Sequence, residues 1–219
     1  MVSIKNDDES IGSLARQASG YFKTEIIKGD LKPGKAISID EISEAGTYSN
    51  AVIREGLARL LASQLVVDDQ DGFQVADQNA DDLDDLRHTR FLLEGVALRD
   101  SIMNGDAEWE RSVTANLERL HNVAPSAWLT AEAAQVRKEF HQALISGSGL
   151  KRILAFLDVI YDQCSWYSVT NGGSPCTDFN GHKTLVEAAL ARDAEAASEQ
   201  LRMLLFPVAH ADGASAIDN

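Results

Sequence analysis

The segment "SIDEISEAGTYSNAVIREGLARLL", residues 38–61, encodes two helices that are separated by a very short connection. Ser38 can cap the first helix, and Glu41 three residues later completes a capping box. This helix is short and ends near Gly46, and the next one starts after Ser49. Two closely linked helices of this kind are typical of a helix-turn-helix.

The flanking sequence narrows the choice further. Apolar residues recur every four positions over residues 11–28, which predicts a helix before the short pair. After the pair, "LVVDDQDGFQV" holds two β-prone runs around Asp71-Gly72, and this dipeptide is a strong signal for a hairpin turn. Helix, short helix, helix and hairpin is the order of a winged helix-turn-helix, a DNA-binding unit.

The rest of the chain is predicted to be helical. Residues 78–84 are polar and acidic and are expected to form a linker between a winged helix-turn-helix over residues 1–77 and a helical domain over residues 85–219. Helices are expected near residues 83–104, 108–122, 130–146, 150–167, 181–192 and 194–205. The predicted fold class is therefore mostly α: an N-terminal winged helix-turn-helix and a C-terminal all-α helical bundle.

The overall charge limits the style of any nucleic-acid binding. The chain has a formal net charge of −14, with 8 basic and 13 acidic residues before position 78 and 12 basic and 21 acidic residues after it. Non-specific DNA affinity comes mostly from neutralised phosphates, so we expect it to be weak and sensitive to salt. A few well-placed donors in a dimer could still give specific binding.

The sequence predicts neither a membrane segment nor a set of disulfide bonds. It has no apolar run long enough to cross a membrane, and its N-terminus "MVSIKNDDES" does not resemble a signal peptide. Cys164 and Cys176 are the only cysteines, so a disulfide framework is not expected. A cytoplasmic protein with no membrane partner and no cofactor is the prediction.

These motifs together resemble a known family. The segment "IIKGDLKPGKAISIDEISEAGTYSNAVIREGLARLLASQLVV" resembles the DNA-binding domain of GntR-type bacterial transcription regulators. The matching positions are Gly29, Leu31, Pro33, Gly34, Ile37, Ile42, Ser49, Ile53, Arg54, Glu55, Leu57, Leu60, Leu65 and Val66. "DLRHTRFLLEGVAL", "RKEFHQAL" and "GHKTLVEAALARDAEAA" resemble elements of the FCD domain, the effector-binding bundle of the FadR subgroup.

The resemblance implies a DNA-contacting surface with two departures. Asp40 and Asn50 stand where the family usually has arginines, so Arg54 is the one retained member of three. Arginine can bridge two acceptors of guanine, whereas asparagine suits adenine, so a more A·T-rich operator or a lower affinity is expected. A surface ion pair is the alternative role for Arg54. The predicted DNA-binding residues are Lys32, Lys35, Ser38, Tyr48, Ser49, Asn50, Arg54 and Gly72.

A third departure concerns metal binding in the bundle. Many family members hold a divalent metal with one Asp and three His, and His141 and His182 correspond to two of those ligands. Arg137 stands at the Asp position and Leu204 at the last His position. Arginine has no lone pair to offer a metal, and two imidazoles fall short of a tight site. We therefore expect no metal, and a metal-dependent regulator remains an alternative.

The same positions suggest a pocket for a small anion. Arg90 interrupts an apolar stripe, so it either pairs with Glu94 one turn later or faces a cavity that receives an anion. Arg137 could replace the metal by pairing with a ligand carboxylate. The two histidines could instead be ordinary core residues. The predicted effector-binding residues are Arg90, Arg137, His141, His182, Tyr161, Trp166 and Tyr167, although the aromatic residues would more often be plain core.

The sequence as a whole favours a transcription regulator. It would bind a palindromic double-stranded DNA operator as a homodimer and respond to a small carboxylate or sugar-acid effector, most often as a repressor. One rival is a ligand-binding or dimerisation protein whose DNA binding has degenerated. An enzyme is the other, and it is disfavoured because His141 and Glu139 form no recognisable catalytic set.

Overall fold

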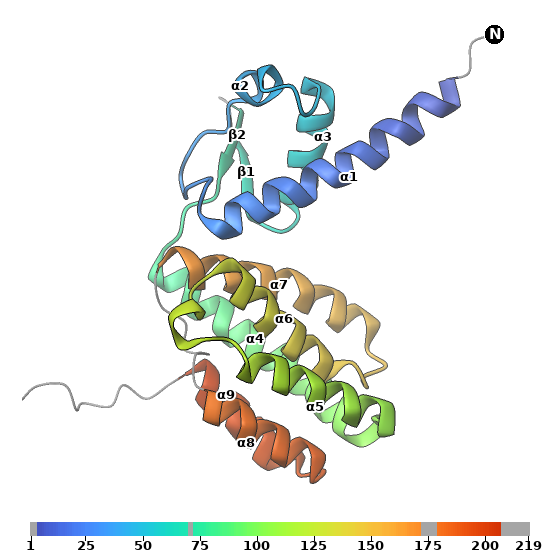
Figure 1. Cartoon of the computed structure of the whole chain (residues 1–219), viewed down its shortest axis with the longest axis vertical. Helices are drawn as coiled ribbons and strands as arrows, with labels where there is room; N and C mark the ends of the chain where they lie inside the picture. The colour runs from blue at the N-terminus through green and yellow to red at the C-terminus, as the bar shows by residue number, and fades with distance from the viewer. Residues whose placement is uncertain (1–3, 70–71, 172–178, 207–219) are drawn as a thin grey trace, which may run out of the picture.

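The computed structural model describes residues 4–69, 72–171 and 179–206. Its N-terminal part consists of three helices followed by a two-stranded antiparallel sheet (Figure 1). These elements are α1 (Ile4–Lys28), α2 (Ile39–Glu44), α3 (Asn50–Leu61), β1 (Val66–Asp69) and β2 (Gly72–Val75). The order confirms the predicted winged helix-turn-helix. Asp71, half of the predicted turn dipeptide, lies outside the described residues, whereas the strands on either side of the turn pair from Val66 with Val75 to Asp69 with Gly72.

The helix starts follow the caps that the sequence predicts. Ser38 Oγ accepts the backbone N–H of Glu41 at 3.3 Å, and Ser49 Oγ accepts that of Val52 at 3.5 Å. Both bonds satisfy backbone donors that the first turn of a helix leaves open. Gly29, in the left-handed region with a φ of 81°, follows α1 as its stop.

The core of the N-terminal part lies between α1, α3 and the sheet. Its fully buried side chains include Phe22 and Ile26 of α1 and Ile53 and Leu57 of α3. Gly56 allows the two helices to approach closely, because a Cβ at that position would lie 3.0 Å from the Cβ of Ala18. The predicted stripe of α3 is therefore the face that packs on α1.

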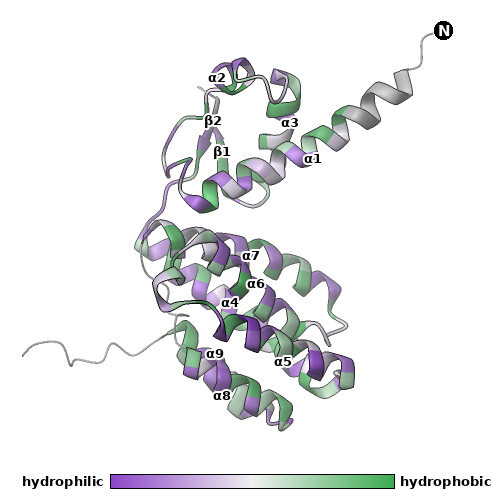
Figure 2. Cartoon of the chain, in the orientation of Figure 1, coloured by the Kyte–Doolittle hydropathy of each residue, from purple (hydrophilic) through white to green (hydrophobic). Residues whose placement is uncertain are grey.

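The C-terminal part is a bundle of helices (Figure 1). They are α4 (Ala80–Asn104), α5 (Ala107–His121), a short 3-10 turn η1 (Pro125–Ala127), α6 (Ala131–Ile145), α7 (Lys151–Thr170), α8 (Phe179–Leu190) and α9 (Ala194–Leu205). Hydrophobic and hydrophilic residues alternate along these helices (Figure 2), as expected when one face of each is buried. The structure confirms the predicted fold class.

One expected boundary differs. Helix α4 begins at Ala80, so most of the segment expected to be a linker over residues 78–84 is its first turn. Asn79 caps this turn by accepting the backbone N–H of Asp82 at 2.7 Å. The acidic residues that suggested an open linker are favourable in a first helical turn, because they face the positive end of the helix dipole.

Helix α7 joins the two parts. Trp166 and Tyr167 near its C-terminal end are buried in the same apolar cluster as Phe22 and Ile26 of α1. Lys23 of α1 also forms an ion pair with Asp162 of α7, with 2.9 Å between Nζ and Oδ2. The bundle and the N-terminal part therefore share a packed interface through this helix. Among the described residues, no helix is long and apolar enough to cross a membrane.

Candidate functional site

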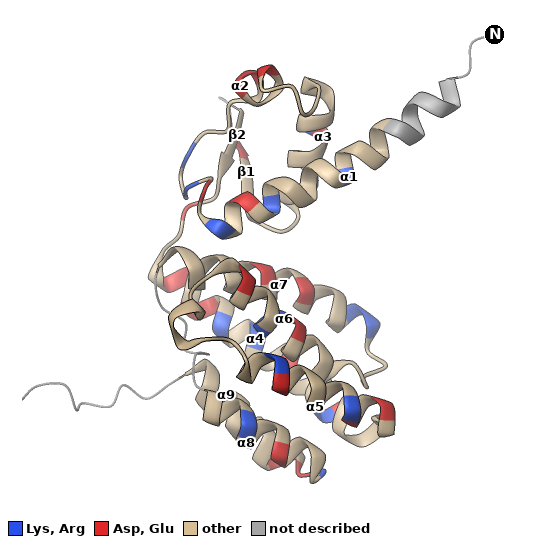
Figure 3. Ribbon diagram, viewed as in Figure 1, with Lys and Arg blue, Asp and Glu red and all other residues tan. Residues whose placement is uncertain are grey.

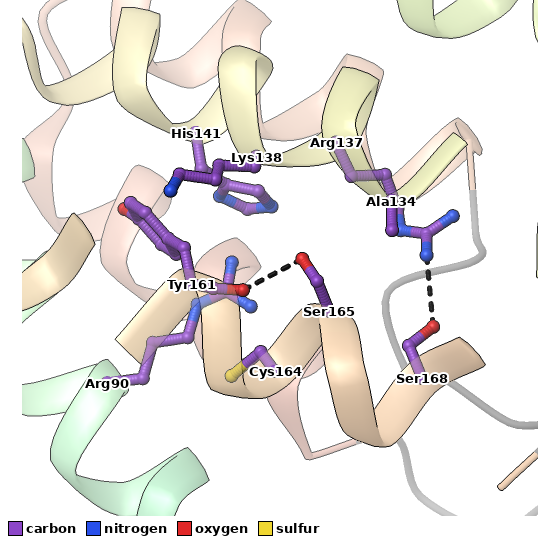
Figure 4. A pocket seen from close by; sticks show the side chains of 9 residues that line it. All are labelled: Arg90, Ala134, Arg137, Lys138, His141, Tyr161, Cys164, Ser165 and Ser168. Atoms are coloured by element: carbon purple, nitrogen blue, oxygen red, sulfur yellow. Dashed lines mark hydrogen bonds between the residues drawn. The ribbon is translucent and has the colours of Figure 1, made fainter. Parts of the chain in front are cut away.

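A small cavity lies inside the bundle between α4, α6 and α7 (Figure 4). Its lining is rich in cations and hydroxyl groups: Arg90, Ala134, Arg137, Lys138, His141, Tyr161, Cys164, Ser165 and Ser168. The cavity volume is about 20 Å³, which is enough for one water molecule. Any larger molecule that binds here must displace the side chains that line the cavity.

A buried carboxylate organises one wall of this cavity. Glu94 of α4 is fully buried, and its two oxygens take different partners: Arg90 Nε at 2.8 Å and His141 Nδ1 at 2.6 Å. Burial would raise the pKa of Glu94, but the charge of Arg90, the imidazole of His141 and the hydrogen bonds of both residues outweigh it and hold the pKa at about 2. Glu94 is therefore ionised at neutral pH.

Arg90 takes part in both arrangements that the sequence left open, the pair with Glu94 and the cavity wall. It pairs with Glu94 one turn later, and it also lines the cavity, with its guanidinium 4.9 Å from the centre of the Tyr161 ring. Burial and the nearby Glu94 carboxylate raise the pKa of Tyr161 well above its ordinary value, so its hydroxyl stays protonated. A cation over an aromatic face is stabilised by the ring's electrons.

The bond to Glu94 fixes the tautomer of His141. An ionised carboxylate only accepts hydrogen bonds, so His141 Nδ1 must carry the proton. Burial keeps the pKa of His141 below its ordinary value despite the neighbouring Glu94, so the ring is neutral at pH 7. Its Nε2 atom is then an acceptor, and it is buried without a hydrogen-bond partner among the described residues. This atom requires a donor such as a hydroxyl group.

Arg137 closes another side of the cavity. Its guanidinium donates to the backbone carbonyl of Trp128 and, at 3.0 Å, to the hydroxyl of Ser168. It also lies 5.6 Å from the centre of the Trp128 ring. The side chain is almost fully buried, so a cation faces the interior of the bundle at the position that the family resemblance gives to a metal ligand.

Lys138, Ser165 and Ser168 are cavity residues that the sequence analysis missed. Lys138 is three residues before His141, and Ser165 and Ser168 follow Tyr161 by four and seven residues. These spacings place each set on one helical face, so extending the predicted sites by one or two turns would have found them. The cation count of the cavity therefore exceeds the prediction.

His182 lies beside His141 without lining the cavity. It is fully buried on α8, with its ring 5.6 Å from that of His141 and 5.3 Å from that of Phe140. The donor set does not fit a divalent metal: Arg137 occupies the place of the acidic ligand, and Leu204 is an apolar core residue. No group of three or more potential metal ligands occurs among the described residues.

Two aromatic residues expected in the pocket lie elsewhere. Trp166 and Tyr167 do not line the cavity; they pack into the apolar cluster of the N-terminal part. The cause is helical geometry, because residues five and six positions after Tyr161 point roughly 140° and 240° away from it around the helix. Tyr167 instead donates to Asp82 Oδ2 at 2.5 Å, and burial together with this bond raises its pKa to about 12.

The other candidate surface is the exposed side of α2 and α3. Asn50 Nδ2 donates to Asp40 Oδ1 at 3.0 Å, so the two residues that depart from the family pattern bond to each other. Among the described residues, Arg54 is exposed and makes no ion pair, whereas Arg59, five residues later, pairs with Glu55 at 2.9 Å. The surface ion pair considered for Arg54 is thus formed by its neighbour.

The remaining predicted DNA contacts surround this surface. Lys32 and Lys35 are exposed on the connection between α1 and α2, where Figure 3 shows basic residues, while acidic residues mark α2 itself. Ser38 and Ser49 are exposed, but their hydroxyl oxygens cap helices. Tyr48 is half-buried with its ring 6.5 Å from that of Tyr21, and Gly72 begins β2 with a φ of 116°.

The fold and the two surfaces define a class of protein: a DNA-binding transcription regulator with a helical regulatory bundle. The comparison with protein families agrees, because residues 85–206 match the FCD domain. The chain belongs to the GntR family of transcription regulators that carry an FCD domain. Its relatives are regulators of transcription and not enzymes.

Individual relatives cover nearly the whole chain. The HTH-type transcriptional regulator BphR of Paraburkholderia xenovorans (strain LB400) is 34% identical over 89% of this chain and 83% of its own length. The HTH-type transcriptional repressor GlaR of Escherichia coli (strain K12) is 28% identical over 86% of this chain and 91% of its own. Among solved structures, E. coli McbR/YncC has the same fold, with a TM-score of 0.70, 20% identity and 94% of each chain covered.

Proposed function

We propose that the protein is a homodimeric repressor that releases a palindromic operator when a small hydroxyl-bearing carboxylate, such as a sugar acid, enters the cavity of the bundle. The cavity carries this proposal. Arg90, Arg137 and Lys138 offer cations to a carboxylate, and His141 Nε2 offers an acceptor to a hydroxyl group. A ligand with both groups would match the cavity better than a plain fatty acid or an inorganic anion.

Repression is supported by a relative, and dimerisation by an exposed apolar face. The E. coli relative GlaR is a transcriptional repressor by name. On α4, Leu92, Val96 and Met103 share one face and are 66%, 51% and 76% exposed. Side chains of this kind in water favour burial against a second surface, and a second copy of α4 offers the same stripe.

The small volume of the cavity supports a ligand-driven change of conformation. A ligand larger than water requires Arg137 to leave the Trp128 carbonyl or Ser168, and Lys138 to change its partners. Such a ligand binds the opened state far better than the closed one, and this difference in affinity is what shifts a conformational equilibrium. Ligand binding and the conformational change are then thermodynamically coupled.

The effector is tested by a thermal-shift screen of sugar acids, hydroxy acids, unsubstituted carboxylates and inorganic phosphate. We expect hydroxy acids to raise the melting temperature most, because only they satisfy His141 Nε2. Arg137→Gln should abolish the rise, and Arg119→Gln, in an ion pair with Glu139 on the outside of the bundle, should keep it. A rise that persists in Arg137→Gln would refute the pocket.

A second candidate is a ligand-binding protein with degenerate DNA binding, and one contact favours it. The amide donor of Asn50 is directed to Asp40, and both stand where the family resemblance gives arginines. A gel shift on the DNA upstream of its own gene separates the two candidates. For a regulator, Arg54→Ala should weaken binding by roughly 5- to 150-fold, the loss of one bidentate base contact. Arg59→Ala on the same helix should change it little. No retardation of wild type at low salt would favour the second candidate.

A further inference from the structure

Helix α7 has two functional faces. Tyr161, Ser165 and Ser168 line the cavity. Asp162, Gln163 and Trp166, which lie between them in the sequence, contact the DNA-binding part. Asp162 pairs with Lys23, Gln163 Nε2 donates to the carbonyl of Ser63 at 3.1 Å, and Trp166 is buried in the same apolar cluster as residues of α1. Cavity and DNA-binding part are thus separated by the thickness of one helix.

One chain of ion pairs passes through Asp162 of this helix. Lys138 of the cavity wall bonds Asp162 Oδ1 at 2.6 Å, and Asp162 Oδ2 bonds Lys23 of α1 at 2.9 Å. The side chains of Lys138 and Asp162 are 7% and 8% exposed, so water screens their interaction little. A carboxylate this buried needs a cationic partner, and its two partners lie on opposite sides of the domain interface.

Lys138 has no spare donor for a ligand. An ammonium group has three N–H donors, and its Nζ atom already lies 3.4 Å from the Asp158 carbonyl, 2.7 Å from Asp158 Oδ1 and 2.6 Å from Asp162 Oδ1. Burial alone would lower the pKa of Lys138, but its bonds to Asp158 and Asp162 outweigh it and raise the pKa. A ligand anion that bonds Lys138 must take it from one of these carboxylates.

We propose that Lys138, Asp162 and Lys23 form the route by which occupancy of the cavity is transmitted to the DNA-binding part. This inference rests on the proposed ligand pocket and adds how it is coupled to DNA. A carboxylate in the cavity draws Lys138 away from Asp162. Lys23 then becomes the sole cationic partner of a buried carboxylate, and α1 shifts its position on α7. Because α1 packs on α3 through Gly56, the helix that carries Arg54 moves with it.

The experiment uses a carboxylate built into the cavity, so it needs neither effector nor operator. Ser165 is half-buried in the cavity wall, one turn after Asp162. Ser165→Asp supplies the charge of a ligand, and Ser165→Asn supplies the same shape without it. Hydrogen exchange of the full-length protein, followed by mass spectrometry, reports the α1 amides around Lys23. We expect these amides to differ between the two variants by at least about threefold in exchange rate.

Background variants decide whether the ionic chain carries the effect. The difference between Ser165→Asp and Ser165→Asn should disappear in Lys23→Met and in Asp162→Asn. It should persist in Asp158→Asn, which removes the other carboxylate of Lys138; among the described residues, Asp158 forms no ion pair with the DNA-binding part. Asp158 is the matched control because it lies one turn before Asp162 on the same helix and bonds the same lysine.

Two results would overturn the proposal. One is an α1 that exchanges alike in both Ser165 variants while α6 and α7 respond; the other is an α1 response that survives in Lys23→Met. If circular dichroism shows Ser165→Asp to be unfolded, Lys138→Met replaces it, with the same expectations, because it also removes Lys138 from Asp162. A thermal-shift screen without any stabilising carboxylate would refute the effector, yet it would leave this measurement valid.

Discussion

The two candidate sites differ in the environment of their polar residues: those of the cavity are buried, and those of the predicted DNA-binding surface are exposed. In the bundle, Arg90, Glu94 and His141 are buried, and Arg90 and His141 each bond one oxygen of Glu94. On the DNA-binding side, Asp40, Asn50 and Arg54 are exposed to solvent. Buried charges must be compensated within the fold, so changes in the bundle affect stability and ligand binding together. Exposed charges are screened, so changes on the DNA side should affect affinity alone.

The largest difference is expected from Glu94→Gln. It leaves Arg90 buried without a carboxylate partner on α4, and breaking a buried pair in this way costs about 3–5 kcal/mol of the free energy of unfolding. For a chain of this length the melting temperature should fall by roughly 6–20 °C. Glu187→Gln makes the same chemical change in an exposed pair with Lys183 at 3.8 Å and should leave the melting temperature almost unchanged. Equal effects of the two variants would contradict the contrast between buried and exposed charge.

The stability of the protein should depend on pH because of the same buried residues, His141 and Glu94. The pKa of His141 is lowered in the folded state, so below the ordinary pKa the unfolded chain binds a proton at His141 more readily than the folded chain does. The contribution of neutral His141 to the free energy of unfolding is complete above the ordinary pKa of 6.5 and is lost as the pH falls below it. Glu94 follows at lower pH: its contribution is present above the ordinary 4.5 and is lost as the pH falls towards about 2.

Urea unfolding from pH 7.5 to 4 should therefore show two successive losses of stability. The free energy of unfolding should decline below about pH 6.5 and more steeply below about pH 4.5. His141→Gln has no imidazole to protonate, so it should lose part of the first decline and keep the second. A first decline that is the same size in His141→Gln would assign it to other groups.

The fold followed from the sequence because its signals are local. Caps at Ser38 and Ser49 and the stripe of Ile53, Leu57 and Leu60 specify their own helices, whatever those helices pack against. The bundle helices were likewise predictable from their periodicity. Helix α4 started earlier than expected because acidic residues, which suggested a linker, also suit a first helical turn.

The site was less predictable because it depends on which helix faces which. The sequence placed Arg90 on an apolar stripe, the family resemblance placed Arg137 and His141 in a pocket, and the structure brings all three to one cavity. It could not tell the face of α7 that lines the cavity from the face that meets the DNA-binding part, since each carries an aromatic residue among polar ones. Trp166 and Tyr167 were assigned to the wrong side for this reason.

The smallest expected effect concerns the acidic residue at the start of α2. Asp40→Asn removes one negative charge from the predicted DNA-binding surface and replaces an acceptor-only carboxylate by an amide, which holds Asn50 less firmly. We expect operator affinity in a gel shift at low salt to rise about two- to fivefold, the range of one screened surface charge. The rise should shrink as salt is added.

The matched control for this change is Glu44→Gln, which removes the same charge from the exposed end of the same helix but does not contact Asn50. If only charge matters, the two variants bind the operator equally tightly. If release of Asn50 adds a contact to the DNA, Asp40→Asn binds more tightly than Glu44→Gln, and the excess disappears when Asn50→Ala is added. An excess that survives Asn50→Ala would show that the Asp40–Asn50 contact does not restrain DNA binding.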